Sequence, residues 1–221
     1  MDPTKVEAIC SWPIPKNVKE LCSFLSFVNF YYQFILNLAE LTLPLTPLTG
    51  KWPWDWSDMQ QSGFESIVSA VSLDRVLAMP DNSLPYHVET DALDFAIGAI
   101  LSQNFDSIQQ PIAFISKSFM DTEWNYSTYD KELFAIVFAF KQWRRYLLDV
   151  VSTTDVLSDH RNLTFYRHPQ DLNRRQAHWV AILQEYDMLI RHVPGCLNAH
   201  VLMPSPAVLT VSLHDSVEGV V

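Results

Sequence analysis

The sequence is poor in the residues that mark several classes of protein. It has 3 cysteines among 221 residues, widely spaced and without a C-x-x-C pair, which disfavours a disulfide framework or a zinc site and predicts reduced, buried thiols. The longest apolar stretches, such as residues 133–140, are too short to span a bilayer. The N-terminal residues MDPTKVEAIC lack the apolar segment of a signal peptide. We therefore expect an intracellular protein, either cytoplasmic or nuclear.

Positive charge is also scarce. There are 15 Lys and Arg residues against 25 Asp and Glu residues, and the resulting net charge of −10 disfavours binding to nucleic acid through overall charge. Residues 141–178 nevertheless contain seven of the 15 basic residues. This stretch is either a local contact region for phosphates or a solvated helix face with its loops, and composition does not decide between them.

The first third of the chain predicts two amphipathic helices separated by a region without regular structure. The segment PKNVKELCSFLSFVNFYYQFI contains Asn17 and Glu20 at the spacing of an N-terminal helix cap, followed by apolar residues at helical spacing. Ser57 and Gln60 have the same spacing before a second helix. The prolines and glycine of LTLPLTPLTGKWPWDW predict a break between the two helices. Its alternating tryptophans favour packing between two domains over a platform for stacking bases.

The rest of the chain predicts a mixed sheet with flanking helices. Three short strands at residues 86–91, 95–102 and 111–116 precede the helical pattern STYDKELFAIVFAFKQWRRYLL. A strand TTDVLSDH, a helix RRQAHWVAILQEY and a last strand YDMLIRHV follow. The order β-β-β-α-β-α-β indicates an α/β domain whose sheet is covered by helices.

Three carboxylates occupy related places in this pattern. Asp91 ends the first strand, Glu132 lies in the first turns of the long helix, and Asp159 ends the fourth strand. If the first and fourth strands are neighbours, the three side chains converge, and clustered acids resist joint ionisation unless cations lie between them. Oxygen ligands suit magnesium or manganese, and a pair of such ions about 4 Å apart supports phosphodiester cleavage. Separate structural roles for each acid are the alternative that the residues alone leave open.

Several longer motifs resemble a known family. The segments ETDALDFAIGAILSQ, LSDHRNL and NRRQAHWVAILQEYDMLIRHVPGCLN are similar to the ribonuclease H domain of reverse transcriptases from gypsy-class LTR retrotransposons, and the first 70 residues resemble the thumb and connecting segment of the same polyprotein. The resemblance implies a thumb and connector over residues 1–78, a ribonuclease H-like domain with a five-stranded mixed sheet over 79–203, and a tail over 204–221.

The same resemblance implies an activity and a site. It makes Asp91, Glu132 and Asp159 the catalytic, metal-binding acids, with Mg²⁺ or Mn²⁺ as the cofactor and the RNA strand of an RNA–DNA hybrid as the substrate. The candidate contacts to nucleic acid are Arg161, Asn162, Arg174 and Arg175. The rest of the polyprotein is a further expected partner, and no membrane is expected.

The departures from the family pattern matter for activity. The family's fourth acid is replaced by Leu202, and Pro204 disfavours the helix that this acid normally begins. In the thumb, two adjacent family arginines are Tyr32 and Gln33. No Tyr-x-Asp-Asp polymerase motif occurs, so the chain has no polymerase active site. Two functions remain open: a weakened Mg²⁺-dependent ribonuclease H, or an inactive domain that binds nucleic acid or protein.

Overall fold

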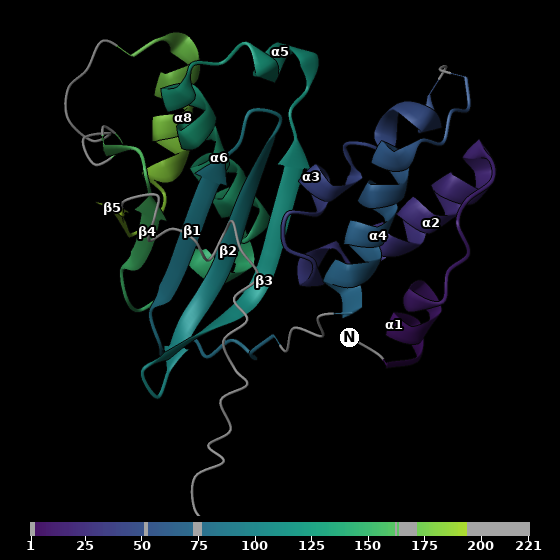
Figure 1. Ribbon diagram of the computed structural model, residues 1–221. Coiled ribbons are helices and arrows are strands. Elements are labelled where there is room, and N and C mark those ends of the chain that lie inside the picture. The colour runs from purple at the N-terminus through teal and green to yellow at the C-terminus, as the bar shows by residue number, and fades with distance from the viewer. Residues whose placement is uncertain (1–2, 51–52, 73–76, 162, 164–171, 194–221) are drawn as a thin grey trace, which may run out of the picture.

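The computed structural model describes residues 3–50, 53–72, 77–161, 163 and 172–193, which form two parts that lie side by side (Figure 1). The N-terminal helical part contains six elements: α1 (Pro3–Cys10), α2 (Val18–Phe30), η1 (Tyr32–Phe34), α3 (Leu38–Thr42), η2 (Thr46–Thr49) and α4 (Asp58–Ser72). The sheet part follows with β1 (Tyr86–Ala92), β2 (Ala96–Phe105), β3 (Ile108–Ser118), α5 (Asp121–Trp124), α6 (Thr128–Gln142), α7 (Arg144–Leu147), β4 (Thr154–Ser158), α8 (Arg174–Leu183) and β5 (Met188–His192). Within the described residues, every helix is too short or too polar to cross a membrane.

The two predicted helices of the N-terminal part are confirmed, together with their caps. Asn17 accepts a hydrogen bond from the Glu20 amide at 3.0 Å, and the Glu20 carboxylate accepts one from the Lys16 amide at 2.8 Å, so each side chain satisfies an amide at the start of α2. Ser57 and Gln60 are also in contact, at 2.6 Å, immediately before α4. These local contacts fix where the helices begin, and their apolar faces then pack into a separate core.

Three expectations about this part were wrong in detail. The proline-rich stretch does contain regular structure, because Pro47 lies in the first turn of η2, where its missing N–H removes no helical hydrogen bond. Trp54 and Trp56 stack at 5.6 Å and pack within the core of the helical part rather than between the two parts, while Trp52 lies outside the described residues. Cys10 and Cys22 are free but exposed, not buried.

The sheet confirms the predicted mixed architecture. Its strand order is β3-β2-β1-β4-β5, with β1 antiparallel to β2 and parallel to β4. The β2–β3 hairpin is longer than predicted, since its turn is made by Asp106 and Ser107 at φ values of 49° and 68°. Residues other than glycine in this left-handed region are uncommon, which is why the turn was not recognised in the sequence.

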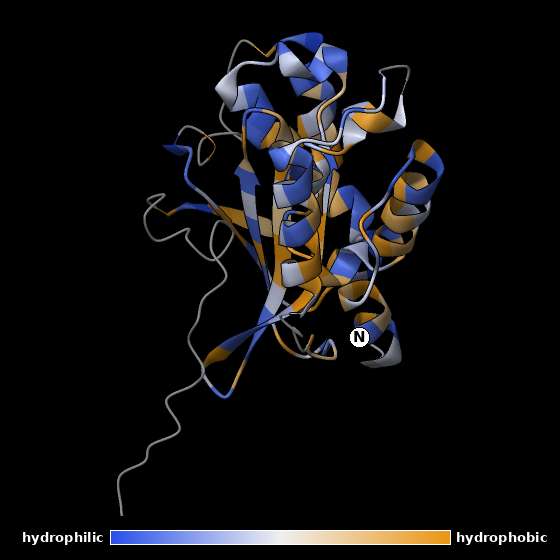
Figure 2. Ribbon diagram, turned by 45° about the vertical axis from the view of Figure 1, so that its right-hand side comes forward, coloured by the Kyte–Doolittle hydropathy of each residue, from blue (hydrophilic) through white to orange (hydrophobic). Residues whose placement is uncertain are grey.

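Helices α6 and α8 cover one face of the sheet (Figure 1). The predicted apolar stripe of the long helix is confirmed, since its members are all buried in the main core: Leu133, Ile136, Val137, Phe140 and Trp143. Figure 2 shows the hydrophobic residues gathered along the strands and the inward sides of the helices. This layer holds α6 firmly against β1 and so positions the residues of its first turns.

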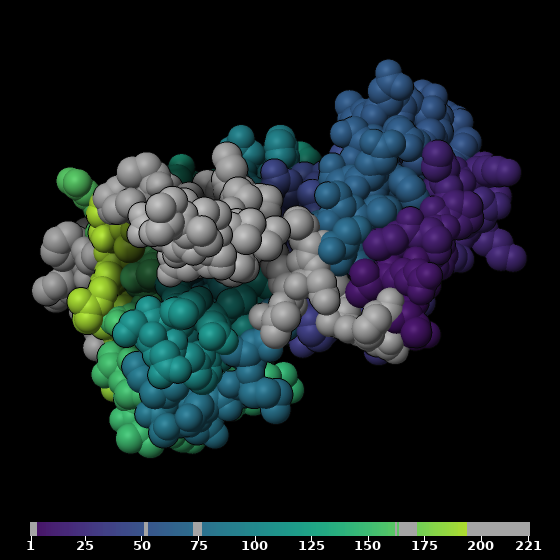
Figure 3. Space-filling model, turned by 60° about the horizontal axis from the view of Figure 1, so that its bottom comes forward, coloured from purple at the N-terminus to yellow at the C-terminus, as the bar shows by residue number. Residues whose placement is uncertain are grey.

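The helical part packs against the β2–β3 half of the sheet. Ile100 and Phe114 are paired across these two strands and form a small buried cluster with Leu36 and Leu77, separate from the core under α6. A hydrogen bond from the Ala39 amide to Ser116 Oγ, at 2.9 Å, joins α3 to β3. Figure 3 shows the two parts as adjacent bodies seen from below. The helical part is therefore packed onto the sheet through α3 and its neighbours.

Candidate active site at the ends of β1 and β4

The three predicted acids come together at one edge of the sheet. Because β1 and β4 are parallel, their carboxyl ends lie at the same edge. Asp91 is the last residue but one of β1, and Asp159 directly follows the last residue of β4. Glu132 lies in the second turn of α6, which packs on β1. Neighbouring strands and one helix thus bring together carboxylates that are up to 68 positions apart in the chain (159 − 91).

Burial and mutual repulsion set the charge of these acids. Glu132 is 3% exposed, and this burial raises its pKa to about 8, with the charges of Asp159 and Asp91 adding to the effect. The Ala92 amide and the Ser158 hydroxyl oppose the rise by donating hydrogen bonds to Glu132. Burial also raises the pKa of Asp91, and the charge of Asp159 raises it further. Each acid therefore makes ionisation of the others more costly.

The unpaired atoms of the site suit a cation. Asp91 Oδ2 and Glu132 Oε2 are buried and have no hydrogen-bond partner, which is costly for a carboxylate oxygen. A divalent cation is the kind of partner that satisfies such oxygens, and the all-oxygen set matches the preference of Mg²⁺. Among the described residues, however, no three Asp, Glu, His or Cys side chains are grouped closely enough to hold one ion together. The donor chemistry fits, and a full ligand shell would need oxygens beyond these side chains, such as water or phosphate.

The predicted nucleic-acid contacts are placed differently from one another. Arg161 is exposed two residues after Asp159, and Arg174 is exposed at the start of α8. Arg175 instead donates to the buried Asp130 carboxylate at 2.7 Å and stacks over the Tyr126 ring at 3.9 Å. Its charge is thus matched by an acid of α6, and it fastens α8 to that helix. Asn162 and Leu202 lie outside the described residues.

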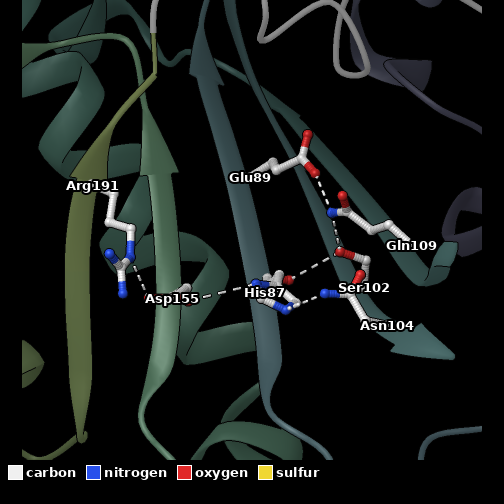
Figure 4. A network of polar contacts seen from close by, with 7 residues as sticks. All are labelled: His87, Glu89, Ser102, Asn104, Gln109, Asp155 and Arg191. Carbon is white, nitrogen blue, oxygen red and sulfur yellow. Dashed lines mark hydrogen bonds and ion pairs between the residues drawn. The ribbon is translucent and has the colours of Figure 1, made fainter. Parts of the chain in front are cut away.

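A polar network below the acids was not recognised in the sequence. It crosses the sheet on the face opposite α6 and consists of seven residues (Figure 4): His87, Glu89, Ser102, Asn104, Gln109, Asp155 and Arg191. Gln109 donates to Glu89 at 2.5 Å, and Arg191 donates to Asp155 at 2.8 Å. His87 is 3.9 Å from Asp155. Alternation along β1 places Glu89 on the same face as Asp91, but the bond to Gln109 gives Glu89 a structural partner that Asp91 Oδ2 lacks.

Comparisons with known proteins agree with this architecture. Residues 81–186 match the family model of the RNase H-like domain found in reverse transcriptase. The chain is 36% identical over 209 residues to the Retrovirus-related Pol polyprotein from transposon opus of Drosophila melanogaster, covering 89% of this chain and 21% of that protein. It is also 36% identical over 197 residues to the Transposon Tf2-3 polyprotein of Schizosaccharomyces pombe, covering 87% of this chain and 15% of that protein. The chain therefore spans about a fifth or less of the curated relatives it matches.

Solved structures show the same fold. A foamy viral protease-reverse transcriptase bound to double-stranded DNA matches 87% of this chain and 35% of its own, with a TM-score of 0.71 and 22% identity. The foamy viral protease-reverse transcriptase in complex with an RNA/DNA hybrid matches 100% of this chain and 30% of its own, with a TM-score of 0.69 and 20% identity. Together with the sequence relatives, the matches show that the chain belongs with the reverse transcriptase polyproteins of retrotransposons and that residues 81–186 are their RNase H-like domain.

Proposed function

We propose that this chain is a metal-dependent ribonuclease H of a gypsy-class reverse transcriptase polyprotein, which hydrolyses the RNA strand of RNA–DNA hybrids. The observation that carries the proposal is the meeting of Asp91, Glu132 and Asp159 at the ends of β1 and β4, with two buried carboxylate oxygens left without partners. A fold that only bound nucleic acid would gain nothing from burying acids there, because they repel phosphates and each other.

The acids have distinct roles in this proposal. Asp91 and Glu132 supply the two unpartnered oxygens, and Asp159 supplies a more exposed carboxylate at the rim. Bound Mg²⁺ or Mn²⁺ lowers the pKa of a water and stabilises charge on the scissile phosphate. The Ala92 amide and the Ser158 hydroxyl orient Glu132 through their hydrogen bonds. Hydrolysis then adds water across one P–O bond of the RNA strand, leaving a phosphate on one product and a hydroxyl on the other.

The hybrid contacts the domain through local cations rather than overall charge. Arg161 and Arg174 are exposed, and Arg161 lies close to Asp159 in the chain, so we assign both to phosphate contacts. Arg175 contributes less because it is already paired with Asp130. A solved foamy viral relative bound to an RNA/DNA hybrid supports this class of ligand.

The activity is expected to be weak. The position of the family's fourth acid is Leu202, which cannot bind a cation. Loss of one charge-stabilising contact costs on the order of a hundredfold to a thousandfold in rate. The competing function is an inactive domain that binds nucleic acid or protein, and it is favoured by the lack of three grouped ligands in the described part of the chain.

A hybrid-cleavage assay separates the two functions. The initial rate on a labelled RNA–DNA hybrid is measured with Mg²⁺ and then with Mn²⁺ for the wild type, Asp91→Asn and the matched control Asp94→Asn. Asp94 is exposed in the turn after β1, so its variant should cut as the wild type does. Asp91→Asn should lower the rate at least about a hundredfold. If the wild type cuts with neither ion, or if Asp91→Asn cuts equally well, the catalytic proposal fails.

A further inference from the structure

A fourth carboxylate approaches the site from the helical part of the chain. Helix α3 contacts both β3 and β2, and the buried Leu38 side chain together with the Ala39–Ser116 hydrogen bond fixes its position. Glu40 is the next residue and is exposed. It is therefore held near the sheet by its neighbours, although its own side chain is not part of the packing.

The strand register shows what lies between Glu40 and the site. Ser116 of β3 is paired with Gly98 of β2, and Gly98 is paired with Asp91 of β1. With strands about 4.8 Å apart, Ser116 and Asp91 are separated by roughly 10 Å along this row. Gly98 has no side chain to occupy the middle position. A glutamate that begins beside Ser116 therefore has a clear path toward Asp91 over the β2 backbone.

Two further observations connect Glu40 to a ligand rather than to surface polarity in general. Its negative charge already acts on Asp91, which it disfavours in the ionised form. Asp91 Oδ2 and Glu132 Oε2 are buried, unpartnered oxygens at the same place. Repulsive placement of another acid beside such oxygens becomes favourable only when a cation is present.

We propose that Glu40 supplies an additional carboxylate to the cation site at Asp91, so that the helical part of the chain completes the acidic cluster of the sheet part. This inference rests on the metal-dependent function proposed above. It differs from the family pattern, in which the fourth acid follows the last strand, at the position of Leu202. Glu40 is a positioning residue for the ion and acts from the other side of the sequence.

Manganese binding tests the proposal without relying on activity. Free Mn²⁺ is followed by electron paramagnetic resonance while each protein is titrated, which gives a Kd for the wild type, Glu40→Gln, Asp91→Asn and Glu7→Gln. Glu7 is exposed on α1 and its variant changes net charge by the same amount, so it is the matched control. Glu40→Gln should weaken Mn²⁺ binding about tenfold, which is the size expected for loss of a supporting metal contact. Glu40→Lys should weaken it more, because it introduces a cation.

The outcomes separate this inference from the proposed function. Weaker binding in both Glu40 variants, with an unchanged Kd for Glu7→Gln, supports the role of Glu40. An unchanged Kd for Glu40→Gln, alongside weakened binding in Asp91→Asn, overturns that role while the metal site stands. Equal Mn²⁺ binding by the wild type and Asp91→Asn overturns the metal site itself. Circular dichroism and metal-free thermal unfolding show that each variant is folded, as expected for changes at exposed residues.

Discussion

Replacing Glu132 by glutamine should make the protein more stable at alkaline pH. In the folded protein the pKa of Glu132 is raised from 4.5 to about 8 by burial and by the nearby charges of Asp159 and Asp91. The unfolded chain loses this proton near pH 4.5, whereas the folded protein keeps it until about pH 8. The free energy of unfolding therefore falls as pH rises from about 4.5 to about 8 and is constant above that range.

The size of the effect follows from the pKa. A rise from 4.5 to about 8 corresponds to a cost of about 5 kcal/mol for ionised Glu132 in the folded state. Rearrangement of the site relieves part of this cost, so Glu132→Gln should gain about 2–5 kcal/mol above pH 8 and little at pH 4.5. For a chain of this length, that gain raises Tm by roughly 5–15 °C. Glutamine also retains an oxygen that can accept from the Ala92 amide.

Thermal unfolding across pH provides the measurement. Tm is recorded from pH 4.5 to pH 9, without divalent ions, for the wild type, Glu132→Gln and Glu7→Gln. The Tm difference between Glu132→Gln and the wild type should grow with pH, while Glu7→Gln should follow the wild type throughout. Adding Mg²⁺ should raise the wild-type Tm at pH 8 and narrow the difference. A difference that is the same at every pH, or a variant that is less stable at pH 9, would refute the placement of Glu132 in a buried acidic cluster.

Two further predictions concern other parts of the chain. Arg175→Met should lower the free energy of unfolding by about 2–3 kcal/mol in urea titrations, since it leaves the buried Asp130 carboxylate without its cation, less than a fully buried pair would cost because Arg175 is partly exposed; the control Arg174→Met should change it by less than about 0.5 kcal/mol. Leu202→Asp combined with Pro204→Leu should raise the hybrid-cleavage rate about tenfold or more, because it restores the family's fourth acid and removes a helix breaker. A double variant that cuts no faster than the wild type would show that position 202 does not limit the rate.

Local sequence signals were sufficient for most elements of the fold. The Asn17–Glu20 and Ser57–Gln60 spacings predicted two helix starts because each cap lies within four residues of the amides it satisfies. The order of strands and helices was also enough to make β1 and β4 neighbours, and so to bring Asp91 and Asp159 together. These inferences succeeded because they depend on short-range hydrogen bonds and on periodic burial.

Features that depend on distant packing were missed. Glu40 has no motif around it, and its place near Asp91 arises only when α3 packs on β2 and β3. Arg175 was grouped with the other arginines because its partner, Asp130, is 45 residues away in the chain. The short helix α1 was not predicted, because its eight residues include only a brief apolar pattern.

The small cluster of Ile100 and Phe114 bears on where this domain can be cut from its neighbours. These two side chains are 5% and 1% exposed, and the residues packed against them are Leu36 and Leu77. Both of those leucines precede residue 81, where the RNase H-like family match begins. The segment that evolution has copied among polyproteins is therefore shorter than the segment that folds without an open oily seam, so inheritance and self-sufficiency have different borders in this protein.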